Sequence, residues 1–434
     1  MDPATMLPIE LLIEVFELCQ EPHQVGFPTG NLMRESPWLL SLVSHEWRTI
    51  ALSTPSLWRK LCIYFSPFPE NVTELTRAFL RRSASFPFSL VICDDGVNFL
   101  PAHRQLISLV TEQSHRWTHL HIISFGCDNK WEQSLASIDG PGCLTMLTQV
   151  NLARTEVSNT LLNFFAHAPR LQVAFLPVLP AGILGDGLFP WHQLTTLTTD
   201  YIDLLVDPML RTLHAIPNLR TLSLRAIGMD DTTPSPSPSL HRRTWSLSSL
   251  ETLTLRISDS AADSYRGALL DGIRLPILTT LSLETLDSSI CHQMAALFQR
   301  SARTSHPLTS LSLSCDSPLF ASELIPVLRQ IPHLSHLVIS EAIIMDDVLM
   351  ALILQPADVL IPLLDFLALQ DTRFTPELLL RVVRSRFNDG YFHSGLPRRL
   401  KYLRMSLHIA EIEPEVARGF NDLCDLGLDA RLLR

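Results

Sequence analysis

The sequence predicts an α/β protein in which a small helical module precedes a long array of strand–helix units. Three observations lead to this prediction. The phrase Pro-x-Leu-x-x-Leu-x-Leu returns many times, segments of helical apolar spacing separate its copies, and apolar residues also recur at helical spacing in the first sixty residues. A self-similar period of this size is typical of a solenoid, because one unit cannot bury its apolar face alone and stacked units can.

The repeated phrase is clearest at residues 217–224, which read Pro-Asn-Leu-Arg-Thr-Leu-Ser-Leu. Its Leu-x-Leu step places both leucines on one face of a short strand. Helix-like segments such as 160–166, 291–298 and 321–328 lie between copies. The alternation predicts a parallel sheet on the concave face and helices on the convex face. The eleven copies start at Trp117, Leu147, Leu171, Leu194, Leu219, Leu250, Leu278, Leu308, Leu334, Leu364 and Leu400.

This pattern resembles the leucine-rich repeat over about two-thirds of the chain. The family's asparagine position holds other residue types in all eleven copies, so we expect no asparagine ladder and an irregular arc. We assign residues 87–434 to a solenoid of about 11–12 irregular repeats, with a loop insertion at 229–246. Three Ser/Thr-Pro steps in that insertion are either phosphorylation sites or part of a flexible spacer.

The first sixty residues predict helices separated by a polar insert. Leu11, Leu12, Val15 and Phe16 recur at helical spacing after a proline that suits a first helical turn. A second helix is predicted from 36–37 through 51, followed by Thr-Pro-Ser-Leu-Trp at 54–58. We assign residues 1–66 to this module and residues 67–86 to a connecting helix.

Leu-Pro-Ile-Glu-Leu-Leu at 7–12, with the segments 42–51 and 54–58, resembles an F-box of the fungal F-box-like type. The resemblance implies a three-helix module that docks a Skp-family adaptor and, through it, a cullin–RING ligase. The alternative is that these side chains only form a small helical core. By match of position, the resemblance assigns the adaptor contact to Leu7, Pro8, Ile9, Leu12, Val43 and Trp47.

The outward strand positions are the default binding surface of such an array. Early and middle copies offer mostly Ser and Thr there, whereas the last three copies offer aromatic and charged residues. Aromatic and arginine side chains often anchor interfaces. The alternative is an ordinary solvated face. The candidate target-binding residues are His336, Asp365, Phe366, Gln370, Lys401, Tyr402 and Arg404.

Composition narrows the functional classes. The net charge of −10 disfavours nucleic-acid binding, and no apolar run reaches the ~18–20 residues of a membrane span. The N-terminus lacks a secretory signal, so we expect a cytoplasmic or nuclear protein. Eight scattered cysteines form no Cys-x-x-Cys pair, and His115, His119 and His121 fit strand positions better than a metal site. With no nucleotide or hydrolase motif, we expect no cofactor and no catalysis.

The F-box-like resemblance, together with the repeats, implies a substrate-recognition subunit of a Skp–cullin–F-box ubiquitin ligase, which binds the adaptor through its N-terminal helices and an unknown target through the solenoid. The first alternative is a non-ligase interaction scaffold or inhibitor that shares the same architecture. A more distant alternative is an enzyme hidden among the irregular repeats.

Overall fold

The computed structural model divides into two compact units, Met1–Leu194 and Thr195–Arg434, called here the N-terminal and C-terminal units. No helix in the part of the chain that the structure describes is long and apolar enough to cross a membrane. The described residues are 7–19, 37–65, 72–94, 101–124, 132, 135, 141–153, 158–178, 189–201, 206–226, 244–257, 267–285, 290–301, 306–315, 318–355, 359–387, 399–406 and 413–432.

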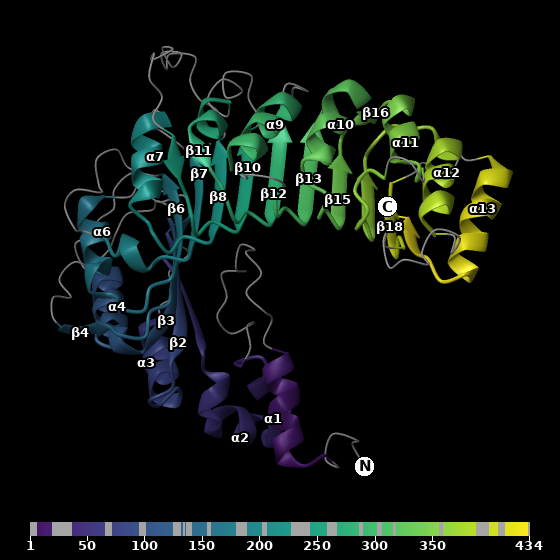
Figure 1. Cartoon of the computed structure of the whole chain (residues 1–434). Coiled ribbons are helices and arrows are strands. Elements are labelled where there is room, and N and C mark those ends of the chain that lie inside the picture. The colour runs from purple at the N-terminus through teal and green to yellow at the C-terminus, as the bar shows by residue number, and fades with distance from the viewer. Residues whose placement is uncertain are drawn as a thin grey trace. The chain divides into compact units, whose positions relative to one another are not determined.

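The N-terminal unit begins with short helices and continues as strand–helix units (Figure 1). Its strands follow the parallel order β1-β2-β3-β5-β6. Its elements are α1 (Ile9–Leu18), η3 (Leu40–Leu42), α2 (His45–Ser53), η4 (Pro55–Leu57), β1 (Lys60–Tyr64), α3 (Val72–Arg82), β2 (Phe88–Asp94), α4 (Pro101–Thr111), η5 (Ser114–Arg116), β3 (Trp117–Ser124), β4 (Pro141–Leu144), β5 (Gln149–Ala153), α6 (Asn159–Phe164), η6 (Phe165–His167), β6 (Val173–Val178) and η8 (Trp191–Gln193).

The C-terminal unit follows the parallel order β7-β8-β10-β12-β13-β15-β17-β18-β19. Its strands line the inner side of a curve, and helices α9 to α13 stand along the outer side (Figure 1). Its elements are β7 (Thr196–Tyr201), α7 (Val206–His214), β8 (Thr221–Ala226), β9 (Trp245–Ser246), β10 (Thr252–Ile257), β11 (Ile273–Arg274), β12 (Thr280–Thr285), α9 (Ile290–Ser301), β13 (Ser310–Cys315), β14 (Pro318–Leu319), α10 (Ala321–Arg329), β15 (His336–Ser340), β16 (Ile343–Ile344), α11 (Asp346–Leu352), β17 (Phe366–Gln370), α12 (Pro376–Phe387), β18 (Tyr402–Met405), α13 (Pro414–Asp425) and β19 (Asp429–Leu432).

The leucines of the repeated phrase form continuous buried columns in this unit. Leu253 of β10 pairs in register with Leu222 of β8 and with Leu281 of β12, and all three side chains are fully buried. Each such side chain contributes roughly 1.5–3 kcal/mol through burial, and only its neighbours in the array can supply that burial. The repeats of this unit thus fold as predicted, into a parallel sheet with helices on one face (Figure 1).

Hydroxyl groups connect successive repeats where the strands begin. The Thr309 hydroxyl donates to the carbonyl of Thr279 at 3.1 Å, and the Ser335 hydroxyl donates to the carbonyl of Thr309 at 3.1 Å. The Thr279 hydroxyl donates in the same way to Glu251, at 3.1 Å. The sequence led us to expect no asparagine ladder, and this run of side-chain to main-chain bonds connects the repeats instead.

The sheet begins one strand earlier than the sequence indicated. β1 lies within residues 1–66, which were assigned to the helical module, and pairs in parallel with β2. α3, expected as a connecting helix within 67–86, therefore lies between two paired strands, as a helix of a repeat does. The expected second helix also starts later, at His45, because the Ser44 hydroxyl accepts a hydrogen bond from the Trp47 amide and caps α2.

Two features of the C-terminal unit were not expected from the repeats. Short parallel ribbons, β9 with β11 and β14 with β16, lie outside the main sheet. β9 falls at the end of the predicted insertion 229–246. The rest of that insertion, with its three Ser/Thr-Pro steps, lies outside the described residues except for residue 244.

Candidate functional site

The first helix carries two apolar faces. Leu12 and Phe16 are buried in the core of the N-terminal unit, whereas Leu11, Val15 and Leu18 are exposed by 45 %, 41 % and 83 %. The exposed three are spaced i, i+4 and i+7, so they form one stripe along the helix. We call Leu11, Val15 and Leu18 the α1 stripe. The apolar spacing predicts a single face, and the structure divides these residues between two faces.

The six side chains assigned to the adaptor contact do not share one environment. Leu7, Pro8, Ile9 and Val43 are exposed. Trp47 is half-buried, with its ring centroid 4.7 Å from that of Phe16. Leu12 is only 2 % exposed, so its assignment to a surface contact was wrong.

Further exposed apolar residues lie beside the predicted set. Leu39 and Leu42, next to the predicted Val43, are each more than half exposed. The sequence analysis did not assign these two, nor the α1 stripe, to the contact. The sequence signal for these exposed residues was their place in the chain, since they lie close to Leu12, Phe16 and Leu40, which the structure buries.

The helical module packs firmly on the first repeat through aromatic residues. The Trp38 and Trp58 rings meet edge to face, with centroids 4.8 Å apart. The Arg82 guanidinium of α3 lies over both rings, at 4.7 and 4.8 Å from their centroids, and burial lowers the pKa of Arg82. The Trp58 indole also donates to the Ala51 carbonyl at 2.8 Å. The exposed apolar residues of α1 and η3 therefore belong to a module whose core is well packed.

Aromatic rings form a row across the last strands of the C-terminal unit. His336, Phe366 and Tyr402 are in register on β15, β17 and β18. The His336 and Phe366 rings stack with centroids 5.4 Å apart, and the Phe366 and Tyr402 rings are 6.3 Å apart. We call these three residues the aromatic row. The same register holds Thr or Ser on β8, β10, β12 and β13, so among these described strands of the C-terminal unit the rings begin at β15.

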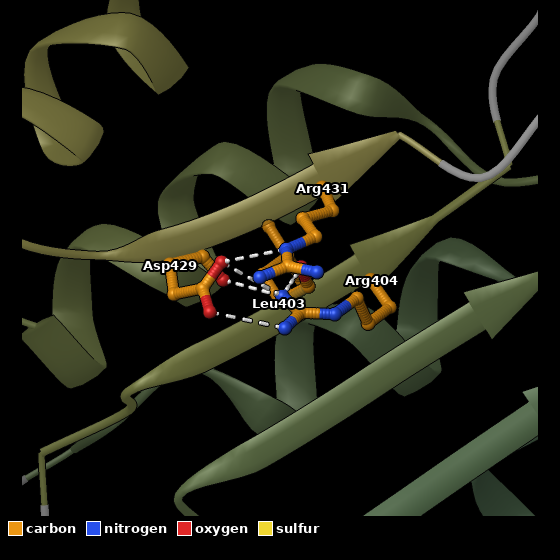
Figure 2. A network of polar contacts seen from close by, with 4 residues as sticks. All are labelled: Leu403, Arg404, Asp429 and Arg431. Carbon is orange, nitrogen blue, oxygen red and sulfur yellow. Dashed lines mark hydrogen bonds and ion pairs between the residues drawn. The ribbon is translucent and has the colours of Figure 1, made fainter. Parts of the chain in front are cut away.

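The aromatic row ends beside a polar network on β18 and β19 (Figure 2). Arg404 donates to both carboxylate oxygens of Asp429, at 3.2 Å to Oδ1 and 3.1 Å to Oδ2, and to the Asp429 carbonyl at 2.7 Å. These bonds from Arg404 are the main reason that the pKa of Asp429 is lowered. Arg431 shares the same carboxylate, at 3.4 Å. Two guanidinium groups therefore share one carboxylate.

The remaining candidate target residues lie around the row. Asp365 and Lys401 precede β17 and β18, and the Asp365 carbonyl accepts hydrogen bonds from the amides of Lys401 and Tyr402. Gln370 is half-buried at the end of β17. Arg404 was expected to face outward, and its guanidinium is bound to Asp429. Asp429 was missed because β19 does not repeat the leucine phrase.

The histidines near β3 take part in local hydrogen bonding. His119 Nδ1 lies 3.2 Å from the Ser89 hydroxyl and 3.0 Å from the Thr118 hydroxyl. Within the described ranges, no three His, Cys, Asp or Glu residues are grouped so that they could hold a metal ion.

Comparisons with known proteins identify no family for the chain. No family model matches it, and no curated protein matches it. Among solved structures, an internalin from Listeria monocytogenes is similar over 82 % of each chain, at 13 % identity and a TM-score of 0.34. A likeness of that size supports neither fold nor function, so both are argued from the residues themselves.

Proposed function

We propose that this chain is a substrate-recognition subunit of a Skp–cullin–F-box ubiquitin ligase. The observation that carries the proposal is the α1 stripe, an exposed apolar surface on a helix whose other apolar face is already buried in an ordered core. An apolar surface of this kind favours a protein partner. The F-box-like sequence around it points to a Skp-family adaptor as that partner.

The aromatic row would hold the target. Aromatic side chains such as Tyr often anchor protein interfaces, and here His336, Phe366 and Tyr402 lie on neighbouring strands in one register. The hydroxyl groups of the earlier strands offer weaker and less selective contacts. In this proposal the chain carries no catalytic group. It raises the local concentration of a target beside the conjugating enzyme, in the cytoplasm or nucleus.

Adaptor binding is tested with the paired substitution Leu11→Asp and Val15→Asp. Both side chains are exposed, so thermal unfolding should change little, while affinity for a purified Skp-family adaptor should fall by at least tenfold in calorimetry. Leu426→Asp, at an exposed leucine of the C-terminal unit, is the control. Leu12→Asp is unsuitable because that side chain is buried.

The outcomes separate the competing functions. Unchanged adaptor affinity in the double variant would refute the α1 stripe as the docking surface. No adaptor binding by the native chain would refute the ligase role and leave a non-ligase scaffold or inhibitor. Proximity labelling with and without a proteasome inhibitor, repeated with Phe366→Ala and Tyr402→Ala, identifies targets that depend on the aromatic row.

A further inference from the structure

A second exposed apolar surface lies on the outer ribbon of the C-terminal unit. Pro318 of β14 pairs in parallel with Ile343 of β16, which in turn bridges to Arg373. The ribbon runs directly into two helices, since Phe320 is the N-cap of α10 and Met345 is the N-cap of α11. This places the ends of three strand-to-helix connections side by side.

Side chains alternate along this ribbon between core and solvent. Leu319 and Ile344 are buried, whereas the neighbouring Phe320, Ile343 and Met345 are exposed. Met350, one turn into α11, is exposed as well. We call Phe320, Ile343, Met345 and Met350 the outer patch, and each is between 36 % and 43 % exposed. None of them belongs to the aromatic row or to the α1 stripe.

Two carboxylates next to the outer patch are held in place by hydrogen bonds. Asp346 accepts a hydrogen bond from the Thr375 hydroxyl at 2.6 Å, and Asp347 accepts one from the Ala321 amide at 3.1 Å. Both donors are neutral, and in the described part of the chain neither carboxylate forms an ion pair. Their negative charge is therefore oriented but not neutralised.

The surroundings add to this negative charge. The three connections, residues 318–323, 341–350 and 371–377, contain six carboxylates and a single guanidinium, that of Arg373. Carboxylates in the first turn of a helix interact favourably with the helix dipole, and this interaction explains part of the acidic composition. The dipole does not account for four exposed apolar side chains placed among the acids.

We propose that the outer patch docks a basic amphipathic segment of a partner protein, with Leu-like or Phe-like side chains bordered by Lys or Arg. Methionine side chains adapt to varied apolar shapes, and a negative rim favours a positive partner. The patch is separate from the α1 stripe and the aromatic row, so this inference does not depend on the ligase role.

The test uses the full chain and a synthetic helical peptide of Leu and Lys with the two residue types on opposite faces. Fluorescence anisotropy should show binding that weakens at high salt. Phe320→Ser with Met345→Ser should weaken it at least tenfold. Asp346→Asn with Asp347→Asn should weaken it severalfold and reduce its salt dependence, because asparagine removes the charge and keeps one acceptor oxygen for the existing hydrogen bond.

Controls separate the patch from the general acidity of the chain. Ile277→Ser, at an exposed apolar residue elsewhere in the unit, and Asp425→Asn, at an exposed acid on α13, should leave peptide affinity unchanged. A peptide with Glu in place of Lys, and a scrambled Leu–Lys peptide, should bind weakly. The proposal fails if these peptides bind equally well, if the patch variants match the native chain, or if the patch instead mediates self-association in light scattering.

Discussion

At the residue scale, buried polar side chains hold neighbouring repeats together. The Arg386 guanidinium donates to the carbonyls of Leu352 at 2.8 Å, Leu360 at 2.8 Å and Ile361 at 3.2 Å. Burial lowers the pKa of Arg386 to about 10, so the side chain stays charged at neutral pH. Ile361 has a positive φ of 44°, which few non-glycine residues adopt. One buried cation therefore stabilises an irregular connection between α11 and β17.

His306 is the residue with the clearest consequence for pH. Its ring is buried against Phe298, at 4.8 Å between centroids, and Nε2 donates to the Leu275 carbonyl at 2.9 Å. Burial lowers the pKa of His306 below its usual 6.5. The folded state therefore holds this imidazole in its neutral form.

We predict that His306 makes the free energy of unfolding fall as the pH drops below about 6.5. The unfolded chain then gains a proton on this ring while the folded chain does not, which costs up to about 1.4 kcal/mol per pH unit until the folded pKa is reached. Above pH 6.5 the contribution is full and constant. His306→Gln should show a shallower slope than the native chain in urea unfolding between pH 7 and 5.

The same substitution at the exposed His333 controls for the loss of one imidazole. Equal slopes for the native chain and His306→Gln would contradict the prediction. A uniform loss of stability at every pH would indicate a packing defect and no proton linkage.

At the element scale, the hydroxyl groups at the strand starts should stabilise the array. Replacing one of these hydroxyls with a methyl group should therefore lower the free energy of unfolding. Thr309→Val keeps the shape and removes the donor to the Thr279 carbonyl, so we expect a loss of about 1 kcal/mol in urea unfolding. Thr280→Val on β12, where no side-chain hydrogen bond of this run is made, should change stability by less than about 0.5 kcal/mol. Equal effects at the two positions would show that the run does not stabilise the array.

The sequence predicted the strands of the array well because their signal is local and repeated. Leu253 and Leu281 fall in register because each occupies the same place in its own copy. Trp58, just before β1, and Leu61 and Ile63 of β1 follow the same spacing, but they come directly after helical segments, and this obscures the strand. The late start of α2 depended on the Ser44 side chain, a local hydrogen bond that apolar spacing does not report.

The candidate surfaces were less predictable because they depend on what lies opposite each side chain. Leu11 and Leu12 are adjacent and chemically identical, yet only Leu12 is buried. Likewise, the sequence marked Arg404 as a cationic anchor, and Asp429 on the next strand turned it into part of a network. Contacts between repeats form only when the chain folds, so the sequence of one repeat does not reveal them.

At the scale of the whole molecule, each repeat contacts mainly its neighbours, so damage should spread only a short distance. Leu337→Ala in β15 removes most of a fully buried side chain and should cost about 2–5 kcal/mol locally. Hydrogen exchange should then accelerate most in β15 and in its partners β13 and β17.

Strands β2 and β3 of the N-terminal unit serve as the internal reference in that experiment. Their exchange should remain close to that of the native chain. Uniform acceleration in both units would mean that the chain unfolds as one cooperative block.

The spacing of the aromatic row also limits the geometry of any ligand that touches all three rings. Such a ligand crosses the strands and meets a ring every 5.4 to 6.3 Å. An extended peptide presents side chains to one side only about every 6.8 Å, so its side-chain spacing is longer than the ring spacing. Successive turns of an α-helix advance by about 5.4 Å, which is closer to the spacing of the aromatic row.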